Sequence, residues 1–342
     1  MSKETVAIIG SGVIGLTTGL ELQKAGFSDI KIYTDRHFSK TTSAKAGAVF
    51  EPYHPGNMAQ TEMLQFVRTG LDRYNKIIDQ HPESETGIRR HDLYSVSTGR
   101  LVPENVPFLD AMPGYKLLLG WEVPGNGIYE SAIVYNDVPF IDPTLALRYL
   151  AGEFEKTEGS VITTPSHKLD NLQEFVDAID ANIIVNASGL GARELTPDPE
   201  IKPMRGQIAV MNYRPKTMNS VLGDDGMYIF PRGSGELILG GTTELGEEVE
   251  QPDDETIHRI VAHAMLFLPD LQFSDLERSY AGLRPFRGPG AKVEIEDQPN
   301  RNKLVISSIG FGGSGWTFGY GAAEKVTHLV TGGHSFKVKS AA

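Results

Sequence analysis

Val6-Ala-Ile-Ile-Gly10-Ser-Gly12-Val-Ile-Gly15, close to the start of the chain, is an apolar run that passes directly into the pattern Gly-x-Gly-x-x-Gly. In dinucleotide sites such a strand ends in a tight turn, and the backbone approaches a pyrophosphate at the N-terminus of the next helix. Leucines continue the helical pattern to about Gly26, and residues 30–33 supply a second apolar strand. The sequence therefore predicts a βαβ unit that binds a dinucleotide.

Composition limits the classes of function. The chain has 342 residues, a net charge of -12 and no cysteine. An acidic protein lacks the basic footprint of nucleic-acid or anionic-membrane binding. Without cysteine there is no disulfide, thiolate nucleophile or zinc–thiolate site, so redox chemistry needs a bound cofactor. The nine histidines show no metal-ligand spacing, and no signal peptide or membrane span is apparent. We expect a cytoplasmic protein without a metal.

Two kinds of segment alternate along the chain. Helices are predicted at residues 63–78, 143–155, 256–268 and 317–329, and strands at 92–97, 132–135, 161–162, 183–186, 206–211, 227–230, 236–239 and 303–308. This order favours an α/β fold in which a Rossmann-like cofactor domain is interleaved with a β-rich α+β substrate domain. We assign residues 1–55, 137–195 and 283–338 to the first domain, and residues 56–136 and 196–282 to the second.

A second glycine-rich turn, Gly310-Phe-Gly-Gly-Ser-Gly315, precedes the last predicted helix. A nicotinamide domain needs one such turn, whereas two-domain flavoproteins commonly use a C-terminal segment to hold the far end of their cofactor. A helix starting at Thr317 would direct its positive end at the flavin. These features predict FAD as the cofactor. The alternative is that the second turn is required only for close packing.

Ten motifs along the chain occur in the order found in the D-amino-acid oxidase family, which includes D-aspartate oxidase. They are Gly10-Ser-Gly12-Val-Ile-Gly15, Tyr33-Thr-Asp35-Arg36, Thr41-Thr42-Ser43, Glu51-Pro52-Tyr53, Asn186-Ala-Ser-Gly189, Arg205-Gly-Gln-Ile208, Tyr228-Ile-Phe-Pro231, Gly240-Gly-Thr242, Gly282-Leu-Arg284-Pro285 and Gly310-Phe-Gly-Gly-Ser-Gly315. The resemblance spans nearly the whole chain. It implies an FAD domain packed against a substrate domain, with the active site between them.

Arg284 is the candidate receptor for a substrate carboxylate, because a guanidinium fork matches the two carboxylate oxygens. It follows a predicted strand and precedes Pro285, and it matches the carboxylate-binding arginine of the family. Tyr228 would donate its hydroxyl to the same carboxylate. The structural alternatives are an interdomain salt bridge for Arg284 and a core or rim position for Tyr228.

The resemblance implies roles for further residues. Catalytic roles fall to Tyr228, Arg284 and Gly313. The substrate wall comprises Glu51, Tyr53, Tyr228, Phe230, Arg284 and Gly313. The cofactor contacts are Gly10, Ser11, Gly12, Val13, Ile14, Gly15, Asp35, Arg36, Thr42, Ser43, Ala48, Val49, Leu169, Ser188, Gly312, Gly313, Ser314, Gly315, Trp316 and Thr317.

The sequence departs from the family at two places near the substrate. Residues 212–227 form a short segment with only Tyr213, which puts a tyrosine-bearing lid in doubt. Glu51 occupies a position that is usually neutral. A carboxylate there would repel D-aspartate and favour a basic side chain or the substrate ammonium; otherwise it is a solvated rim residue.

These features together predict an FAD-dependent oxidase of D-amino acids. Hydride transfer gives an imino acid, water releases the 2-oxo acid and ammonia, and dioxygen becomes hydrogen peroxide. With the carboxylate held by Arg284 and the amine neutral, no protein general base is required, and none is obvious. The alternatives are an oxidase or dehydrogenase of glycine, secondary amines or L-amino acids, and a non-catalytic flavin-binding protein. The expected partners are a D-amino acid and dioxygen; a homodimer is left open.

Overall fold

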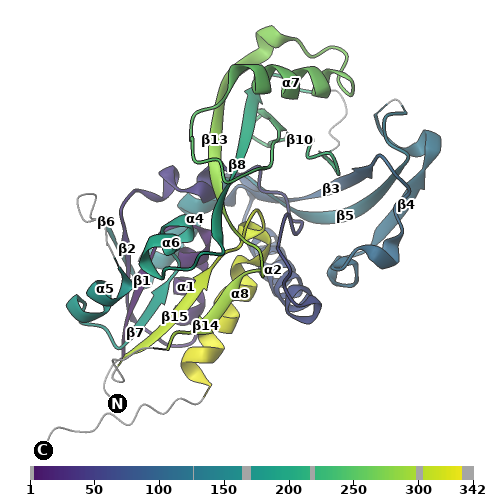
Figure 1. Cartoon of the computed structure of the whole chain (residues 1–342). Helices are drawn as coiled ribbons and strands as arrows, with labels where there is room; N and C mark the ends of the chain where they lie inside the picture. The colour runs from purple at the N-terminus through teal and green to yellow at the C-terminus, as the bar shows by residue number, and fades with distance from the viewer. Residues whose placement is uncertain (1–3, 126, 164–170, 216–219, 298–302, 333–342) are drawn as a thin grey trace, which may run out of the picture.

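Two β-sheets organise the computed structural model of this chain, which describes residues 4–125, 127–163, 171–215, 220–297 and 303–332 (Figure 1). The first sheet contains β1 (Thr5–Ile9), β2 (Asp29–Thr34), β6 (Ser160–Thr163), β7 (Ile183–Asn186), β14 (Lys292–Ile295) and β15 (Leu304–Ile309). The second contains β3 (Ile88–Ser97), β4 (Tyr115–Leu119), β5 (Ser131–Ile141), β8 (Ile201–Met211), β9 (Ser220–Gly223), β10 (Tyr228–Pro231), β11 (Leu237–Gly240), β12 (Glu244–Leu245) and β13 (Leu276–Arg287). The helices are α1 (Val13–Lys24), α2 (Gln60–Gln80), α3 (Glu83–Thr86), α4 (Pro143–Lys156), α5 (Leu172–Ala178), α6 (Ala192–Leu195), α7 (Asp254–Met265) and α8 (Gly315–Thr331).

The first sheet has the strand order β14-β15-β7-β1-β2-β6. All its strands are parallel except β14, which pairs antiparallel with β15. The apolar run at the start of the chain forms the central strand, because β1 pairs with β2 on one side and β7 on the other. The strand order therefore reverses at β1, and Gly10 follows at its carboxyl end. In open α/β sheets this switch point is where ligands bind.

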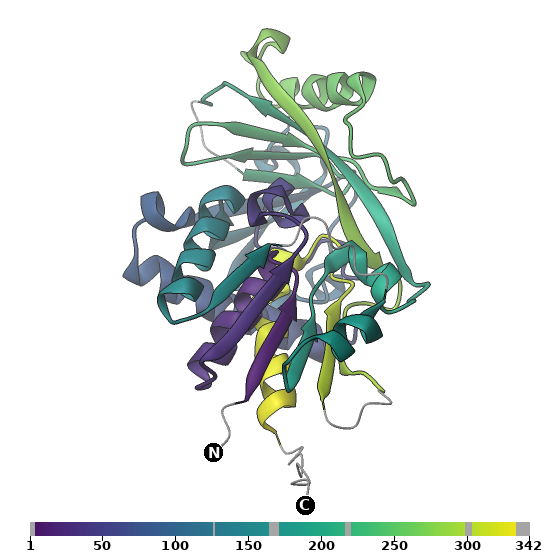
Figure 2. The ribbon, with the colours of Figure 1, turned by 90° about the vertical axis from the view of Figure 1, so that its left-hand side faces the viewer.

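The second sheet has the strand order β12-β8-β11-β10-β9-β3-β5-β4, and β13 pairs with β8. β13 pairs antiparallel with β8 along its whole length, from Leu276 opposite Met211 to Arg287 opposite Ile201. The register shifts once, between Leu276 and Arg278. In Figure 1 this pair runs from α7 at the top of the molecule down toward the parallel sheet, and the turned view of Figure 2 places the antiparallel sheet above the parallel one. The fold is therefore the predicted α/β arrangement, with a Rossmann-like unit and a second, β-rich unit.

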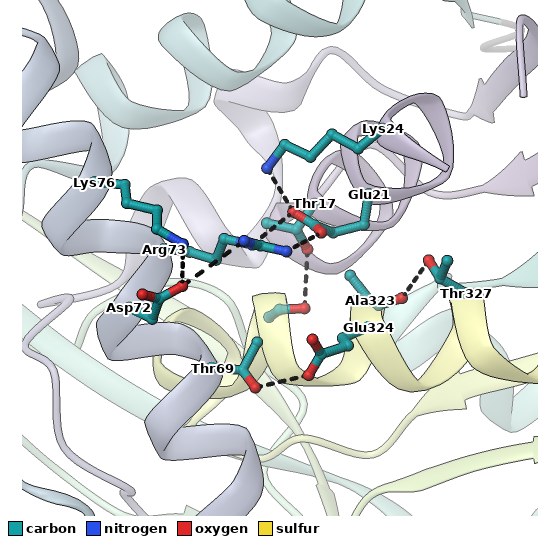
Figure 3. A network of polar contacts seen from close by, with 11 residues as sticks. Thr17, Glu21, Lys24, Thr69, Asp72, Arg73, Lys76, Ala323, Glu324 and Thr327 are labelled. Carbon is teal, nitrogen blue, oxygen red and sulfur yellow. Dashed lines mark hydrogen bonds and ion pairs between the residues drawn. The ribbon is translucent and has the colours of Figure 1, made fainter. Parts of the chain in front are cut away.

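Polar contacts join α2 to the helices beside the parallel sheet (Figure 3). The buried carboxylate of Glu21 on α1 accepts two hydrogen bonds from Arg73 of α2, at 2.7 and 3.1 Å, and one from Lys24 at 2.7 Å. Thr69 of α2 donates to Glu324 of α8 at 2.8 Å. A buried carboxylate is expensive unless it is paired, so these contacts fix α2 against α1 and α8.

The predicted elements agree with the structure in type and approximate place, but the helix predicted at residues 256–268 ends at Met265, and a further difference concerns Arg284. This residue was expected between a strand and Pro285, but β13 continues through Pro285, which pairs with Pro203 of β8, to Arg287. The division into domains at the residues given above stays a prediction; β5 and β13 each extend across one of its boundaries. None of the described helices combines the length and apolar character that crossing a membrane requires.

Candidate active site

One cavity of about 1010 Å³ brings the predicted cofactor and substrate residues together. It begins at the turn after β1, runs past the N-terminus of α8 and reaches the antiparallel sheet. The candidate residues that line it are Gly10, Ser11, Gly12, Val13, Ile14, Asp35, Arg36, Thr42, Ser43, Ala48, Val49, Glu51, Tyr53, Ser188, Tyr228, Phe230, Arg284, Gly312, Gly313, Gly315 and Trp316. Its volume is at the upper end for small-molecule sites, as a dinucleotide requires.

The turn between β1 and α1 is built for close backbone approach. Gly10 has φ +107°, and a Cβ on Gly15 would lie 1.9 Å from the Gly10 carbonyl oxygen. Gly12 precedes α1 without a side-chain cap, and the first turn of α1 has no acidic residue. One N–H is occupied, since Val13 donates to Ser43 Oγ at 3.0 Å. The positive end of α1 therefore faces the cavity without a protein anion, as a pyrophosphate site requires.

The N-terminus of α8 is tied to residues 43–53 on the opposite wall. Ser314 Oγ accepts from the Tyr53 N–H at 2.9 Å, Trp316 Nε1 donates to the Ser43 carbonyl at 3.1 Å, and Thr317 Oγ1 donates to the Glu51 carbonyl at 2.9 Å. No acidic residue lies in the first turn of α8. Two helices thus present uncompensated positive ends to one cavity.

Four predicted cofactor residues do not line the cavity. Gly15 lies against the strand turn, while Ser314 and Thr317 use their side chains to hold the walls together. Leu169 is outside the described residues, as is part of the short segment 212–227. Asp35 lines the cavity, but its carboxylate accepts hydrogen bonds from Arg36 at 2.7 to 3.1 Å. These assignments stay predictions.

Arg284 stands out among the cations of the cavity wall. The other three, Arg36, Lys45 and Arg193, each lie 2.6 to 2.7 Å from a carboxylate oxygen. Arg284 has no carboxylate partner among the described residues. Its Nη1 donates to the Thr242 carbonyl at 2.9 Å, and its guanidinium carbon lies 5.3 Å from the centre of the Tyr53 ring. The other guanidinium N–H groups have no acceptor in the part of the chain described here, so the salt-bridge interpretation has no support.

Tyr228 on β10 faces the same cavity. Its ring stacks on Phe230 with centroids 4.7 Å apart, and no described residue hydrogen-bonds its hydroxyl. Burial raises the pKa of this hydroxyl, and Arg284 opposes the rise. A Cβ on Gly240 would lie 2.0 Å from the Tyr228 ring, so the glycine leaves room for it. The hydroxyl stays protonated and is available as a donor.

Glu51 is buried, with 8% of its surface exposed, so its interpretation as a solvated rim residue is wrong. Ser95 Oγ lies 3.4 Å from Oε1, and Oε2 has no hydrogen-bond partner among the described residues. Burial raises the pKa of Glu51 to about 8, against a small lowering by Ser95. At neutral pH the group is mostly a neutral acid in the free protein. Because a neutral Glu51 carries no charge, its repulsion of the D-aspartate side chain is weaker than the sequence predicts.

This burial makes stability depend on pH. The ordinary pKa of 4.5 is raised to about 8, so between these values the folded protein holds a proton that the unfolded chain has lost. The free energy of unfolding therefore falls as pH rises through this window, by several kcal/mol at roughly 1.4 kcal/mol per unit. Glu51→Gln is expected to remove the fall and to melt above the wild type at pH 8. Thermal unfolding at pH 5 and pH 8 tests this, with Glu174→Gln as an exposed control; parallel slopes in all three proteins would contradict it.

A second cavity of about 910 Å³ shares Glu51, Tyr53 and Leu222 with the first. Its charged lining is mainly acidic; besides Glu51 it comprises Asp224, Asp225, Glu244, Asp253, Arg205 and Arg259, together with His54. Burial lowers the pKa of His54, and the charge of Arg284 lowers it further. No motif of the sequence predicts this cavity or the contact of Ser95 with Glu51. Thr242, whose carbonyl accepts a hydrogen bond from Arg284, is a further residue of the site that was not predicted. Its one indication in the sequence is the Gly240-Gly-Thr242 motif.

Comparisons with known proteins agree with this architecture. The sequence model of the family described as FAD dependent oxidoreductase matches residues 5–329. The chain is 30% identical to a D-amino-acid oxidase of Streptomyces coelicolor over 95% of this chain and 96% of that protein. It is also 30% identical to a D-amino-acid oxidase of Rubrobacter xylanophilus, over 94% of each chain. A glycine oxidase structure from Bacillus cereus superposes with a TM-score of 0.78 at 17% identity, covering 96% of this chain and 98% of that one.

Proposed function

The chain belongs to the FAD-dependent oxidoreductase family, and from this premise we propose that it is a D-amino-acid oxidase. The observation that carries the proposal is Arg284, a cation on the cavity wall with no described carboxylate partner. Such a fork is unfavourable without an anion and favourable with a planar carboxylate. The two relatives that are 30% identical along nearly their whole length favour D-amino acids as the source of that carboxylate.

FAD is the cofactor of this family, and the described residues fit it. The uncapped N-terminus of α1 suits the pyrophosphate, and that of α8, with Gly312 and Gly313, suits the electron-rich end of the isoalloxazine ring. Bound FAD supplies an oxidant that accepts a hydride from the substrate Cα.

The side chains of this protein have separate tasks. Arg284 binds the substrate carboxylate through two parallel hydrogen bonds, and Tyr228 donates its hydroxyl to the same group. The Thr242 carbonyl and the Tyr53 ring hold the guanidinium in place. Phe230 and Tyr53 shield the reacting carbon from water. The imino acid formed at Cα is hydrolysed to a 2-oxo acid and ammonia, and dioxygen is reduced to hydrogen peroxide.

The second cavity would receive the side chain of the substrate. Because its carboxylates outnumber its cations, we expect neutral and basic D-amino acids to be better substrates than D-aspartate. The alternative function is an oxidase of glycine, in line with the fold shared with glycine oxidase. Glycine would leave the second cavity empty of substrate.

Anaerobic mixing of the yellow holoenzyme with amino acids tests the proposal. The panel contains glycine and both enantiomers of alanine, leucine, arginine and aspartate. We expect the flavin absorbance to bleach with D-enantiomers only, most slowly with D-aspartate, and oxygenated samples to form hydrogen peroxide. Bleaching by L-enantiomers, or by glycine alone, would assign another substrate class. No bleaching with any member would leave only the flavin-binding role.

A further inference from the structure

Glu51 is the buried carboxyl group of the cofactor and substrate cavity that lacks a cation. Of the other carboxylates on its wall, Asp35, Glu194 and Glu250 pair with Arg36, Arg193 and Lys45. Glu174 is exposed and accepts from the Asn171 side-chain amide at 2.8 Å. Glu51 Oε2 is buried without a hydrogen-bond partner among the described residues. Leaving such an oxygen unsatisfied costs free energy, which a donor from a ligand recovers.

The antiparallel sheet places Glu51 across from the carboxylate-binding residues. Ser95 of β3 pairs with Leu222 of β9, and Leu222 pairs with Tyr228 of β10. Paired residues of adjacent strands point to the same face, and strands are about 4.8 Å apart, so Ser95 and Tyr228 lie on one face about 10 Å apart. Since Ser95 contacts Glu51 Oε1 and both Glu51 and Tyr228 line the cavity, the Glu51 carboxyl group and the Tyr228 side chain lie on one face of this sheet.

Among the described residues, the cavity therefore offers one unpaired cation, Arg284, and one unpaired buried carboxyl group, Glu51. A free amino acid presents the complementary pair, a carboxylate and an ammonium group separated by a single carbon. An apolar substrate end would leave Oε2 unsatisfied, whereas an ammonium group donates a charge-assisted hydrogen bond to it.

We propose that Glu51 binds the substrate ammonium group and accepts one of its protons. The inference rests on the proposed function, since it takes an amino acid as the substrate. When the ammonium group binds, Glu51 first releases its own proton to solvent and becomes a carboxylate. In the step, an N–H bond of the ammonium then breaks, its electron pair stays on nitrogen, and an O–H bond forms at Glu51. The nitrogen lone pair then forms the C=N bond as the Cα hydrogen leaves with its electrons to FAD. The expectation that no residue serves as a base is replaced by this assignment.

The surroundings of Glu51 suit proton exchange near neutral pH. Ser95 from β3 and Tyr135 from β5 face it, the latter with a pKa raised by burial and by the Glu51 charge. Arg284, His54, Asp224 and Asp225 share one or both of the cavities that Glu51 lines. A general base acts best with a pKa near the working pH, and the Glu51 pKa of about 8 meets this condition.

Calorimetry with two redox-inert probes on the FAD-loaded enzyme tests the proposal. The first probe is 2-aminoisobutyrate, which has an ammonium group but no Cα hydrogen. The second is pivalate, in which a methyl group replaces the ammonium group. At pH 7 Glu51 is mostly protonated in the free protein, so pairing with the ammonium displaces close to one proton. Titrations in buffers of different ionisation enthalpy measure this release. We expect it for 2-aminoisobutyrate with the wild type, and not for pivalate.

Variants identify the group that loses the proton. Glu51→Gln should abolish proton release and weaken the binding of 2-aminoisobutyrate at least tenfold relative to the binding of pivalate. Glu174→Gln should match the wild type in both measurements. Ser95→Ala, which removes a hydrogen bond that lowers the Glu51 pKa, should keep the release but move its pH midpoint upward. Unchanged proton release in Glu51→Gln, or equal release with both probes, would overturn the proposal. Both probes are achiral, so a wrong D-specificity does not affect the result; failure of both to bind would overturn the carboxylate site as well.

Discussion

Arg284→Ala is expected to lose at least about 2 kcal/mol of substrate binding, roughly thirtyfold in affinity, while retaining its FAD. The wild-type guanidinium meets a single described acceptor, the Thr242 carbonyl, so most of its hydrogen-bonding capacity is left for the ligand. Removing it leaves the substrate carboxylate in the cavity without a counter-charge. Binding of pivalate and kcat/KM for a neutral D-amino acid measure the effect. Arg284→Lys should recover only part of it, because an ammonium group lacks the fork.

A second cation of the same wall provides the matched control for Arg284. Arg193 lines the cavity but is paired with Glu248 at 2.6 Å. Its replacement by alanine removes the same charge from the wall without exposing an unpaired site, so substrate binding should stay within about twofold. If Arg193→Ala weakened the binding of pivalate as much as Arg284→Ala did, binding would depend on the overall charge of the cavity and not on the guanidinium group of Arg284.

Gly15→Ala is expected to abolish FAD binding and to destabilise the protein by more than about 3 kcal/mol. The added methyl carbon would lie 1.9 Å from the Gly10 carbonyl oxygen, a backbone atom at the end of the central strand. α1 would have to move away from β1, and its N-terminus would leave the cavity. Bound flavin absorbance and the melting temperature measure the two effects.

Two other glycines separate folding from cofactor binding. Within 4 Å, the one described atom that a Cβ on Gly12 would meet is Ser43 Oγ, at 3.0 Å. Gly12→Ala should therefore fold but bind FAD at least tenfold more weakly, because it blocks the approach of the phosphates. A Cβ on Gly152, within α4, would meet no atom of the described residues within 4 Å, so Gly152→Ala should keep its FAD and gain up to about 1 kcal/mol of stability. A Gly12→Ala protein with wild-type affinity for FAD would place the pyrophosphate elsewhere.

Local patterns were sufficient to predict much of this fold. The segment Ile183–Asn186 is a strand at the predicted residues, and Asp142 caps α4 by accepting from the Thr144 and Leu145 N–H groups at 3.0 and 3.3 Å. Such features depend on residues close in sequence, which a periodicity or a capping residue reveals. The two glycine-rich turns are likewise visible in the sequence, and the structure brings both to one cavity.

Long-range pairing was not visible in the sequence. Pro285 indicates the end of a strand, yet it lies within a continuous β13. In the described sheet β13 pairs with β8 alone and is therefore an edge strand, where a missing N–H is tolerated. The state of Glu51 depends on Ser95, which is 44 residues away, and on burial by the second sheet. A glutamate in isolation looks charged and exposed; only the packing around it makes it a neutral acid with a free oxygen.

The placement of β1 at the centre of the parallel sheet affects how the protein is made. Its neighbour β7 lies about 180 residues further on, and the second glycine turn of the cavity follows at Gly312. At translation speeds of about 5 to 20 residues per second, the Gly10 turn leaves the ribosome roughly 15 to 60 s before Gly312 does. During that interval one wall of the cofactor cavity is missing, and β1 lacks a partner on one edge until β7 has been made. We therefore expect flavin capture to be a late event in biosynthesis, and the nascent chain has to keep the apolar β1 from aggregating until β7 pairs with it.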